Sequence, residues 1–198
     1  FLSPYTQNVK RKINSYTGSE FFITNKLQNL KKINFRKNIK KILISFGGSD
    51  PKNYTFKLIK KIKINKKYNY NFILGPGNPH KFKNTKNIIF TKAPNKKRFN
   101  KIRSECDISI VSGGITMFEN LKCNLPSLVV PTTFQEKKNS EKLARQGLII
   151  TLKKFTTKHI EEHLELLIKK KRISIYKKLV LFNKNKSLLS NIIKKIFN

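Results

Sequence analysis

The chain has 198 residues, enough for one ordinary domain or for one domain with a short appendage. Apolar residues make up 38% and include 15 Phe, a content that supports a packed core and excludes a globally disordered chain. No apolar run approaches the length of a transmembrane helix, and the formal net charge of +34 directs attention to anionic partners.

The positive charge comes almost entirely from lysine, with 38 Lys against 6 Arg. A basic surface attracts phosphate backbones and anionic lipids. However, lysine accompanies 22 Asn and abundant Ile and Phe, the residues of A/T-rich codons, whereas arginine, which reads bases through bidentate hydrogen bonds, is scarce. We attribute the charge to codon bias and expect no specific nucleic-acid partner. A membrane surface is left open as a partner, without a motif that supports it.

The first 39 residues are polar and rich in turn formers, with isolated aromatic residues. We interpret residues 1–39 as a connector that enters a domain. The chain begins at Phe1 without the pattern typical of a signal peptide, which suggests a fragment or a processed start.

Residues 40–155 alternate short apolar runs with segments of helical periodicity. We predict strands at 41–46, 70–75, 87–91, 107–111, 127–130 and 148–152. We predict helices from Pro51 onward and at 95–106, 115–123 and 135–147. Strands that alternate with helices of this length indicate an α/β fold, a Rossmann-like parallel sheet with helices on both faces.

From Thr156 onward the periodicity is helical, with an apolar stripe formed by Ile160, Leu164, Leu167 and Ile168. Lysine is frequent at the other positions, as expected for a solvent-exposed face. We therefore interpret residues 156–198 as a helical extension that packs on the domain and closes the sheet.

Two glycine turns follow predicted strands and precede predicted helices. Ligands of open α/β sheets bind at the carboxyl ends of the strands. Glycine lets the backbone approach a ligand closely, and the amides at the start of the following helix can hold an anion. A tight turn between strand and helix explains a single pair equally well, so the argument rests on the occurrence of two. The residues concerned are Gly47, Gly48, Ser49, Ser112, Gly113, Gly114 and Thr116.

One acid and two amides follow the second glycine turn. The carboxylate of Glu119 could accept hydrogen bonds from a ribose diol, but with Thr116 it also fits a capping box that would satisfy the helix amides. Gln135 and Asn139 open the next helix, where they either reach the same cleft or provide ordinary helix-start polarity.

Several kinds of catalytic and cofactor site are not indicated. The sequence has neither a G-x-G-x-x-G fingerprint nor a Walker loop, so we expect no cofactor. His159 and His163 lie four residues apart but lack a third ligand, so we expect no metal site. Ser-His-Asp and Cys-His sets do not suggest themselves, and Asp50 and Glu119 are the acids near the candidate edge. The pattern indicates a binding domain without a catalytic residue of its own.

Cys106 and Cys123 are the two cysteines of the chain, and neither has a partner at C-x-x-C or metal-ligand spacing. Both flank predicted core elements. We expect buried free thiols in a reducing compartment, the cytoplasm, and leave a disulfide open.

Four motifs occur in a fixed order: "ILISFGGSDPKN", "FILGPGNP", "CDISIVSGGITMFENLKCNLPSLVVP" and "FQEKKNSEKLARQG". Together they resemble the C-terminal half of the bacterial UDP-sugar hydrolases of pseudaminic acid synthesis, enzymes that are related to a spore-coat polysaccharide protein. The pattern is similar, more distantly, to the C-terminal domain of the family 28 glycosyltransferases that make lipid II. The resemblance covers residues 40–152 and implies the C-terminal domain of a GT-B-type fold, in which a nucleotide sugar binds between two Rossmann-like domains.

The resemblance also implies roles for the candidate residues. The turn at 47–49 would line the phosphate and sugar side, the turn at 112–116 would meet the diphosphate, and Glu119 would bind the ribose. Gln135 would reach the sugar or a phosphate, and we count Asn139 with it as a binding residue.

Gly75 and Gly77 of "GPG" would border the uracil pocket.

Two features of this chain differ from the hydrolases. Phe134-Gln135 stands where they usually show Asn-Gln, and the N-terminal domain, with its glycine-rich loop and water-activating histidine, is absent from this chain.

We therefore predict the UDP-sugar-binding C-terminal domain of a hydrolase that releases UDP from a diacetamido-trideoxy hexose, with an N-terminal GT-B domain as its partner in cis or as a separate chain. Alone, the chain should bind a uridine nucleotide weakly and turn over little. The alternative is a family 28-like glycosyltransferase domain; "GGSD" rather than "GGSxG" favours the hydrolase. A second alternative is a lysine-rich module that binds nucleic acid or a membrane surface.

Overall fold

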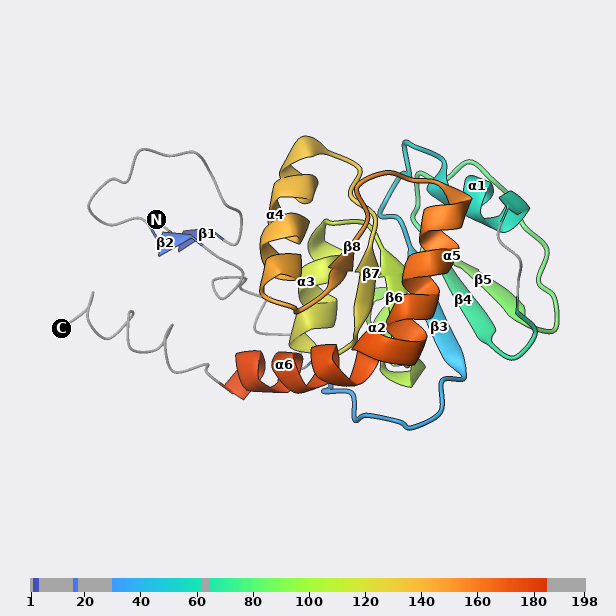
Figure 1. Cartoon of the computed structure of the whole chain (residues 1–198). Coiled ribbons are helices and arrows are strands. Elements are labelled where there is room, and N and C mark those ends of the chain that lie inside the picture. Colours follow the sequence, from blue (N-terminus) through green and yellow to red (C-terminus); the bar gives the residue numbers. More distant parts are fainter. Residues whose placement is uncertain (1, 4–15, 18–29, 62–64, 185–198) are drawn as a thin grey trace.

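A computed structural model describes residues 2–3, 16–17, 30–61 and 65–184 of the chain (Figure 1). Its main feature is a six-stranded parallel sheet in the order β5-β4-β3-β6-β7-β8. The strands are β3 (Lys41–Ser45), β4 (Asn69–Leu74), β5 (Ile88–Lys92), β6 (Ile108–Val111), β7 (Ser127–Val129) and β8 (Ile150–Thr151). Two shorter strands, β1 (Leu2–Ser3) and β2 (Tyr16–Thr17), form a separate parallel pair.

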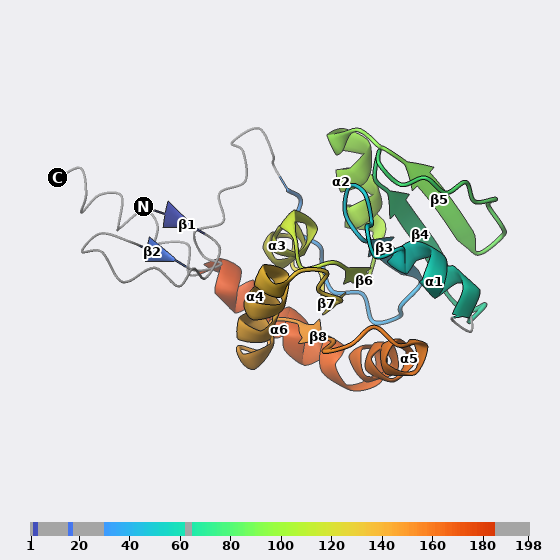
Figure 2. The same ribbon diagram turned by 90° about the horizontal axis from the view of Figure 1, so that it is seen from above.

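Helices connect or follow these strands. They are α1 (Tyr54–Lys61), α2 (Lys96–Glu105), α3 (Ile115–Lys122), α4 (Phe134–Arg145), α5 (Thr157–Leu166), the π-helix η2 (Leu167–Lys171) and α6 (Arg172–Lys184). Figure 2 shows α1 and α5 on one face of the sheet and α2 and α3 on the opposite face. Right-handed crossovers produce this arrangement, because β4 and β5 lie on one side of β3 and the later strands lie on the other. The predicted α/β fold with helices on both faces is confirmed.

Strands β3, β6 and β7 are buried on both faces, so buried residues follow one another along each strand instead of alternating with exposed ones. Ile42, Leu43 and Ile44 of β3 are at most 1% exposed. Ile42 and Ile44 belong to the larger core cluster, whereas Leu43 packs in a second cluster with Cys106 and Cys123. Strand β3 therefore contributes to the core on both faces of the sheet.

The direction in which strands are added to the sheet reverses at β3. The chain adds β4 and β5 on one side of β3 and then crosses to the other side, so that Ile44 pairs with both Phe72 and Ile110. At such a switch point, the segments that follow the two central strands diverge and leave a crevice at the carboxyl edge. Here these segments begin after Ser45 and Val111, and they contain the two glycine turns.

The predicted strands and helices agree with the structure to within two residues, except at the start of the first helix. We expected that helix from Pro51, but α1 begins at Tyr54. The reason is Asp50, whose carboxylate accepts hydrogen bonds from the amides of Tyr54 (2.9 Å) and Thr55 (2.8 Å) and so caps the helix. Most of the predicted connector 1–39 lies outside the described residues.

The tail is helical as far as the structure describes it, in agreement with the prediction. Ile160, Leu164 and Leu167 of the predicted apolar stripe are buried in the larger core cluster, and Ile168 packs against it. None of the helices in the described part of the chain is long and apolar enough to cross a membrane. The division into segments 1–39, 40–155 and 156–198 stays a prediction.

Helix α6 runs past the carboxyl ends of α3 and α4 (Figure 1). Asn183 donates from Nδ2 to the carbonyl oxygen of Leu121 (2.7 Å) and to Oδ1 of Asn124 (2.6 Å). Lys178 donates from Nζ to the carbonyl oxygen of Gln146, just beyond α4, at 3.4 Å. The tail is therefore bonded to both helices that follow β6 and β7.

Asp107, the residue before β6, fastens the segment that enters the sheet. Its Oδ2 accepts from the amides of Lys40 (2.8 Å) and Lys41 (2.9 Å), and its Oδ1 accepts from Nη1 of Arg36 (3.0 Å). The Asp107 side chain is 3% exposed. By contrast, Glu105 bonds Nζ of Lys41 at 2.8 Å in a pair whose side chains are 45% and 41% exposed.

The Asp107→Ala substitution should lower the free energy of unfolding by about 2–3 kcal/mol, because two partly buried backbone amides and the Arg36 guanidinium lose the acceptor that a buried side chain provides. Glu105→Ala removes the same charge nearby and should cost at most about 1 kcal/mol, since an exposed ion pair contributes little. Urea unfolding of both variants measures the difference. Equal losses in the two variants would contradict the role assigned to Asp107.

Candidate functional site

Three loops meet at the carboxyl edge of the sheet, after β3, β4 and β6. The amide of Gly77 donates to the carbonyl oxygen of Gly48 at 3.0 Å, which links the first loop to the second. Across the switch point, Oγ of Ser112 lies 3.8 Å from where a Cβ on Gly47 would be, so the third loop lies close beside the first. The structure therefore brings together both predicted glycine turns and the predicted pair Gly75 and Gly77.

Two of these positions require glycine for different reasons. Gly47 has φ +86°, in the left-handed region that other residues rarely adopt. A Cβ on Gly75 would lie 2.1 Å from the carbonyl oxygen of Gly48, so the two backbones approach too closely for any side chain. Nothing lies within 4 Å of the position that a Cβ on Gly48 would take. Ser49 is the nearest neighbour of Gly77, with its Cβ 3.3 Å from the corresponding position.

The second glycine turn packs against the start of α4. A Cβ on Gly113 would lie 2.8 Å from Cβ of Glu136 and 3.1 Å from its carbonyl oxygen. Gly114 is the N-cap of α3 and supplies no side-chain hydrogen bond to the helix. Amides at an uncapped helix start are suited to an anion, because they point outward and carry the positive end of the helix dipole.

Glu136 is a further residue of this edge, outside the set predicted from the sequence. Its Oε2 accepts from the amide and from Oγ1 of Thr132, both at 2.7 Å, while Oγ1 of Thr133 accepts from the Glu136 amide at 3.2 Å. The S/T-x-x-E signal of a capping box is present at 133–136 and could have identified it. Its Oε1 would lie 3.2 Å from a Cβ on Gly114, so a carboxylate stands beside the glycine turn.

The alternative in which Thr116 and Glu119 form a capping box is wrong, because α3 begins at Ile115 and Thr116 is its second residue. Glu119 is paired instead with Arg103 of α2, whose Nη2 donates to its Oε2. Arg103 is 1% exposed and also donates from Nη1 to Oδ1 of Asn100 at 2.7 Å. No sequence signal identifies Arg103 as a residue of the site, since its partner lies on another helix.

The ion pair fixes the orientation of Glu119 without using all of its acceptor capacity. An ionised carboxylate has two oxygens and about four lone-pair sites, and Arg103 occupies Oε2. The Glu119 side chain is 14% exposed, so part of it reaches the surface of α3. The same carboxylate can therefore neutralise a buried guanidinium and accept a hydrogen bond from a hydroxyl group of a ligand.

Polar and apolar side chains stand together at the start of α4. Gln135 donates from Nε2 to Oδ1 of Asn139 at 3.3 Å, so these two predicted residues lie side by side. Phe134, the first residue of α4, is 73% exposed, and Ile115, the first residue of α3, is 61% exposed. Two large apolar side chains therefore face solvent at the helix starts that flank the second glycine turn.

The other candidate groups have local roles. Among the described residues, no three metal-ligating side chains gather at one place, and Nδ1 of His163 donates to the backbone oxygen of His159 at 2.8 Å. Cys106 and Cys123 are buried free thiols, as predicted, and burial raises the pKa of the Cys106 thiol to about 12. Neither cysteine belongs to the three loops of the candidate site.

No family model matches the chain. It is similar to the spore coat polysaccharide biosynthesis protein SpsG of Bacillus subtilis (strain 168), with 28% identity over 126 residues, 59% of this chain and 37% of that protein. It is also similar to the uncharacterized protein MJ1062 of Methanocaldococcus jannaschii, with 33% identity over 103 residues, 48% of this chain and 21% of that protein. The chain therefore spans well under half the length of these curated relatives.

Solved glycosyltransferases share the fold of this chain. The glycotransferase of kitacinnamycin matches with a TM-score of 0.64 and 12% identity, over 87% of this chain and 47% of its own. The spinosyn rhamnosyltransferase SpnG, complexed with thymidine diphosphate, matches with a TM-score of 0.60 and 14% identity, over 83% and 46%. SsfS6 of Streptomyces sp. SF2575, also complexed with thymidine diphosphate, matches with a TM-score of 0.57 and 11% identity, over 81% of this chain and 42% of its own. The domain has the Rossmann-like fold of GT-B glycosyltransferases, as predicted.

The Gly75→Ala substitution should destabilise the domain by about 1–3 kcal/mol, because its Cβ would collide with the backbone of Gly48 and separate two loops. Gly48→Ala is the matched control and should change stability by less than about 0.5 kcal/mol, since its Cβ meets open space. Thermal and urea unfolding of the two variants provide the comparison. A Gly75→Ala variant as stable as Gly48→Ala would show that the close approach of the loops is not required.

Proposed function

We propose that this domain binds the nucleotide sugar of a GT-B-type glycosyltransferase at the carboxyl edge of its sheet. The observation that carries the proposal is the meeting of two glycine turns across the switch point between β3 and β6. The similarity to SpsG and the thymidine diphosphate bound to two structural neighbours support the ligand class. The proposed binding residues are Gly47, Gly48, Ser49, Gly75, Gly77, Ser112, Gly113, Gly114, Thr116, Glu119, Gln135 and Asn139.

The diphosphate binds at the second glycine turn in this proposal. The first amides of α3, which Gly114 leaves without a side-chain cap, donate to phosphate oxygens, and the helix dipole adds a favourable field. Glu119 accepts from the ribose hydroxyls while Arg103 holds its other side. Gln135, whose amide bonds the buried Asn139, extends the polar surface toward the sugar, and Asn139 holds Gln135 in place from within α4.

Transfer of the glycosyl group is favoured over hydrolysis. In transfer, an acceptor hydroxyl forms a bond to the anomeric carbon, the bond from that carbon to the diphosphate oxygen breaks, and the nucleoside diphosphate leaves with the electron pair. The solved neighbours are glycosyltransferases, and none of the comparisons supports the hydrolase reading. The "GGSD" run no longer favours hydrolysis, because its Asp50 is 2% exposed and caps α1, a structural role that either reaction allows.

In our proposal, the catalytic base of the reaction comes from outside this chain. An acceptor must be activated from the other side of the nucleotide sugar, which assigns the catalytic base to an N-terminal GT-B domain, in cis or as a separate chain. The exposed Ile115 and Phe134 support such a partner, since large apolar side chains beside a polar site favour contact with another protein surface. The isolated chain should therefore bind nucleotide and show little turnover.

Binding of UDP or TDP should raise the melting temperature of the chain by about 4 °C at a concentration about ten times Kd. Glu119→Gln should weaken that binding about tenfold or more, because the ribose loses a charged acceptor. Glu162→Gln, an equal loss of charge at an exposed position of α5, should leave it unchanged. Differential scanning fluorimetry and calorimetric titration measure both quantities.

Two results would contradict the proposal. The first is an absence of protection by either nucleotide. The second is equal protection by pyrophosphate that does not depend on Glu119, which would attribute binding to the general lysine charge and revive the nucleic-acid or membrane alternative. Strong binding to DNA or anionic vesicles at physiological salt, in a variant whose glycine turns are removed, would point the same way.

A further inference from the structure

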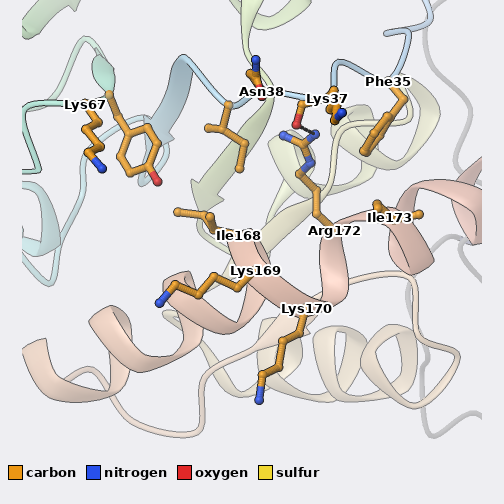
Figure 3. A pocket seen from close by; sticks show the side chains of 11 residues that line it. Phe35, Lys37, Asn38, Lys67, Ile168, Lys169, Lys170, Arg172 and Ile173 are labelled. Carbon is orange, nitrogen blue, oxygen red and sulfur yellow. Dashed lines mark hydrogen bonds between the residues drawn. The ribbon is translucent and has the colours of Figure 1, made fainter.

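A pocket of about 410 Å³ opens at the amino-terminal edge of the sheet, opposite the candidate site (Figure 3). Its walls come from the segment before β3, the turn before β4, and the junction of η2 with α6. The cations that line it are Lys37, Lys67, Lys169, Lys170 and Arg172. None of the described residues in its lining carries a carboxylate. The pocket therefore gathers positive charge without an acid of its own.

Arg172, the first residue of α6, is the central group of this pocket. Its guanidinium donates from Nη2 to the carbonyl oxygens of Arg36 and Lys37, the latter at 3.0 Å, and stacks 4.4 Å above the ring of Phe35. Figure 3 shows it extending from the helix to the backbone of Lys37. The residue is 5% exposed, and its Nη1 is buried without a hydrogen-bond partner in the described part of the chain.

A buried guanidinium with an unused donor is costly, because neither water nor protein replaces the lost hydration. Burial accordingly lowers the pKa of Arg172, and the charge of Asp107 only partly opposes this. Asp107 does not supply the missing acceptor, because its oxygens bond Arg36, Lys40 and Lys41 and neither of them receives a hydrogen bond from Nη1 of Arg172. An anion in the pocket would supply what the guanidinium lacks.

The π-helix η2 contributes to the same wall. Its wider turn at Leu167–Lys171 ends directly before Arg172, and it carries Lys169 and Lys170 into the lining. Lys169 is paired with Glu165 one turn earlier, whereas Lys170 takes part in none of the ion pairs among the described residues. Single π-helical turns occur frequently at functional sites, where they alter which side chains face a ligand.

We propose that this pocket binds the phosphate group of a phosphate ester that carries an apolar or aromatic body. Arg172, after a small rotation about its terminal bonds, presents Nη1 to one phosphate oxygen. Lys37 and Lys170 line the same pocket and reach the other oxygens, Lys170 after its flexible side chain, which extends away from Arg172 in Figure 3, has turned toward the ligand. The volume exceeds that of a phosphate alone. The remaining wall contains Phe35, Tyr68 and Ile168, which suit the apolar body. This site lies at the opposite sheet edge from the nucleotide-sugar site and does not depend on that function.

Titration of the full chain with phenyl phosphate and with inorganic phosphate tests the proposal, with calorimetry and melting temperature as readouts. Phenyl phosphate should bind more tightly than inorganic phosphate. The double variant Lys37→Gln/Lys170→Gln changes two exposed residues whose side-chain amines make no hydrogen bond in the described part of the chain, and it should weaken binding about tenfold or more. Lys83→Gln/Lys86→Gln, an equal loss of charge on the exposed loop before β5, should change it less than about twofold.

Vesicle sedimentation at about 150 mM salt distinguishes two sources of the phosphate. If vesicles of phosphatidylcholine with phosphatidylglycerol bind the chain, and the Lys37/Lys170 variant but not the control loses this binding, the ligand is a phospholipid headgroup. If only phenyl phosphate shows this pattern, the ligand is a soluble phosphate ester. The proposal would be overturned if the pocket and control variants lost affinity for the probes equally, or if neither probe bound the chain. Arg172→Lys provides a further check, and unchanged affinity in a folded Arg172→Lys variant would also overturn it.

Discussion

Strand β3 pairs in parallel with β4 on one side and with β6 on the other, and the geometry of the carboxyl edge depends on this double pairing. Because the three strands end at the same edge, the segments that follow them begin within reach of one another. The backbone contact of Gly48 with Gly75 and Gly77 then joins two of those segments on one side of the switch point. The third segment faces them with an uncapped helix start. Hydrophobic burial of β3 thereby determines where polar backbone groups become available to a ligand.

Three carboxylates near this edge perform different tasks. The carboxylate of Asp50 accepts hydrogen bonds from two amides of α1. One oxygen of Glu136 accepts from the amide and the hydroxyl group of Thr132, just before α4. Glu119 alone of the three is held by a cation, and a buried one, which orients it while leaving an oxygen for other contacts. In a chain with 44 basic and 10 acidic residues, each of these three acids takes part in a defined hydrogen bond or ion pair.

The sheet, its helices and the two glycine turns could be predicted from the sequence, because apolar periodicity and glycine placement are local signals. The partners of single side chains could not. Arg103 meets Glu119 only after α2 and α3 have packed on the same face, and the capping signals at Thr116 and Thr133 look alike until the helix starts are known. The start of α1 was misjudged for the same reason, since a proline suits a first turn as well as the loop that Asp50 closes. The pocket around Arg172 joins residues more than 130 positions apart, a distance that no sequence pattern spans.

Helix α6 is attached to the far ends of α3 and α4 through Asn183 and Lys178, while the near ends of those helices flank the second glycine turn. An α-helix is stiff along its axis, and the eight residues of α3 span about 12 Å. The two ends of α3 are therefore held by different parts of the molecule, the carboxyl end by the tail and the amino end by the packing of the second glycine turn against α4. Truncation of the chain before α6 would remove the support at the carboxyl end of α3 while leaving the residues of the carboxyl edge in the sequence.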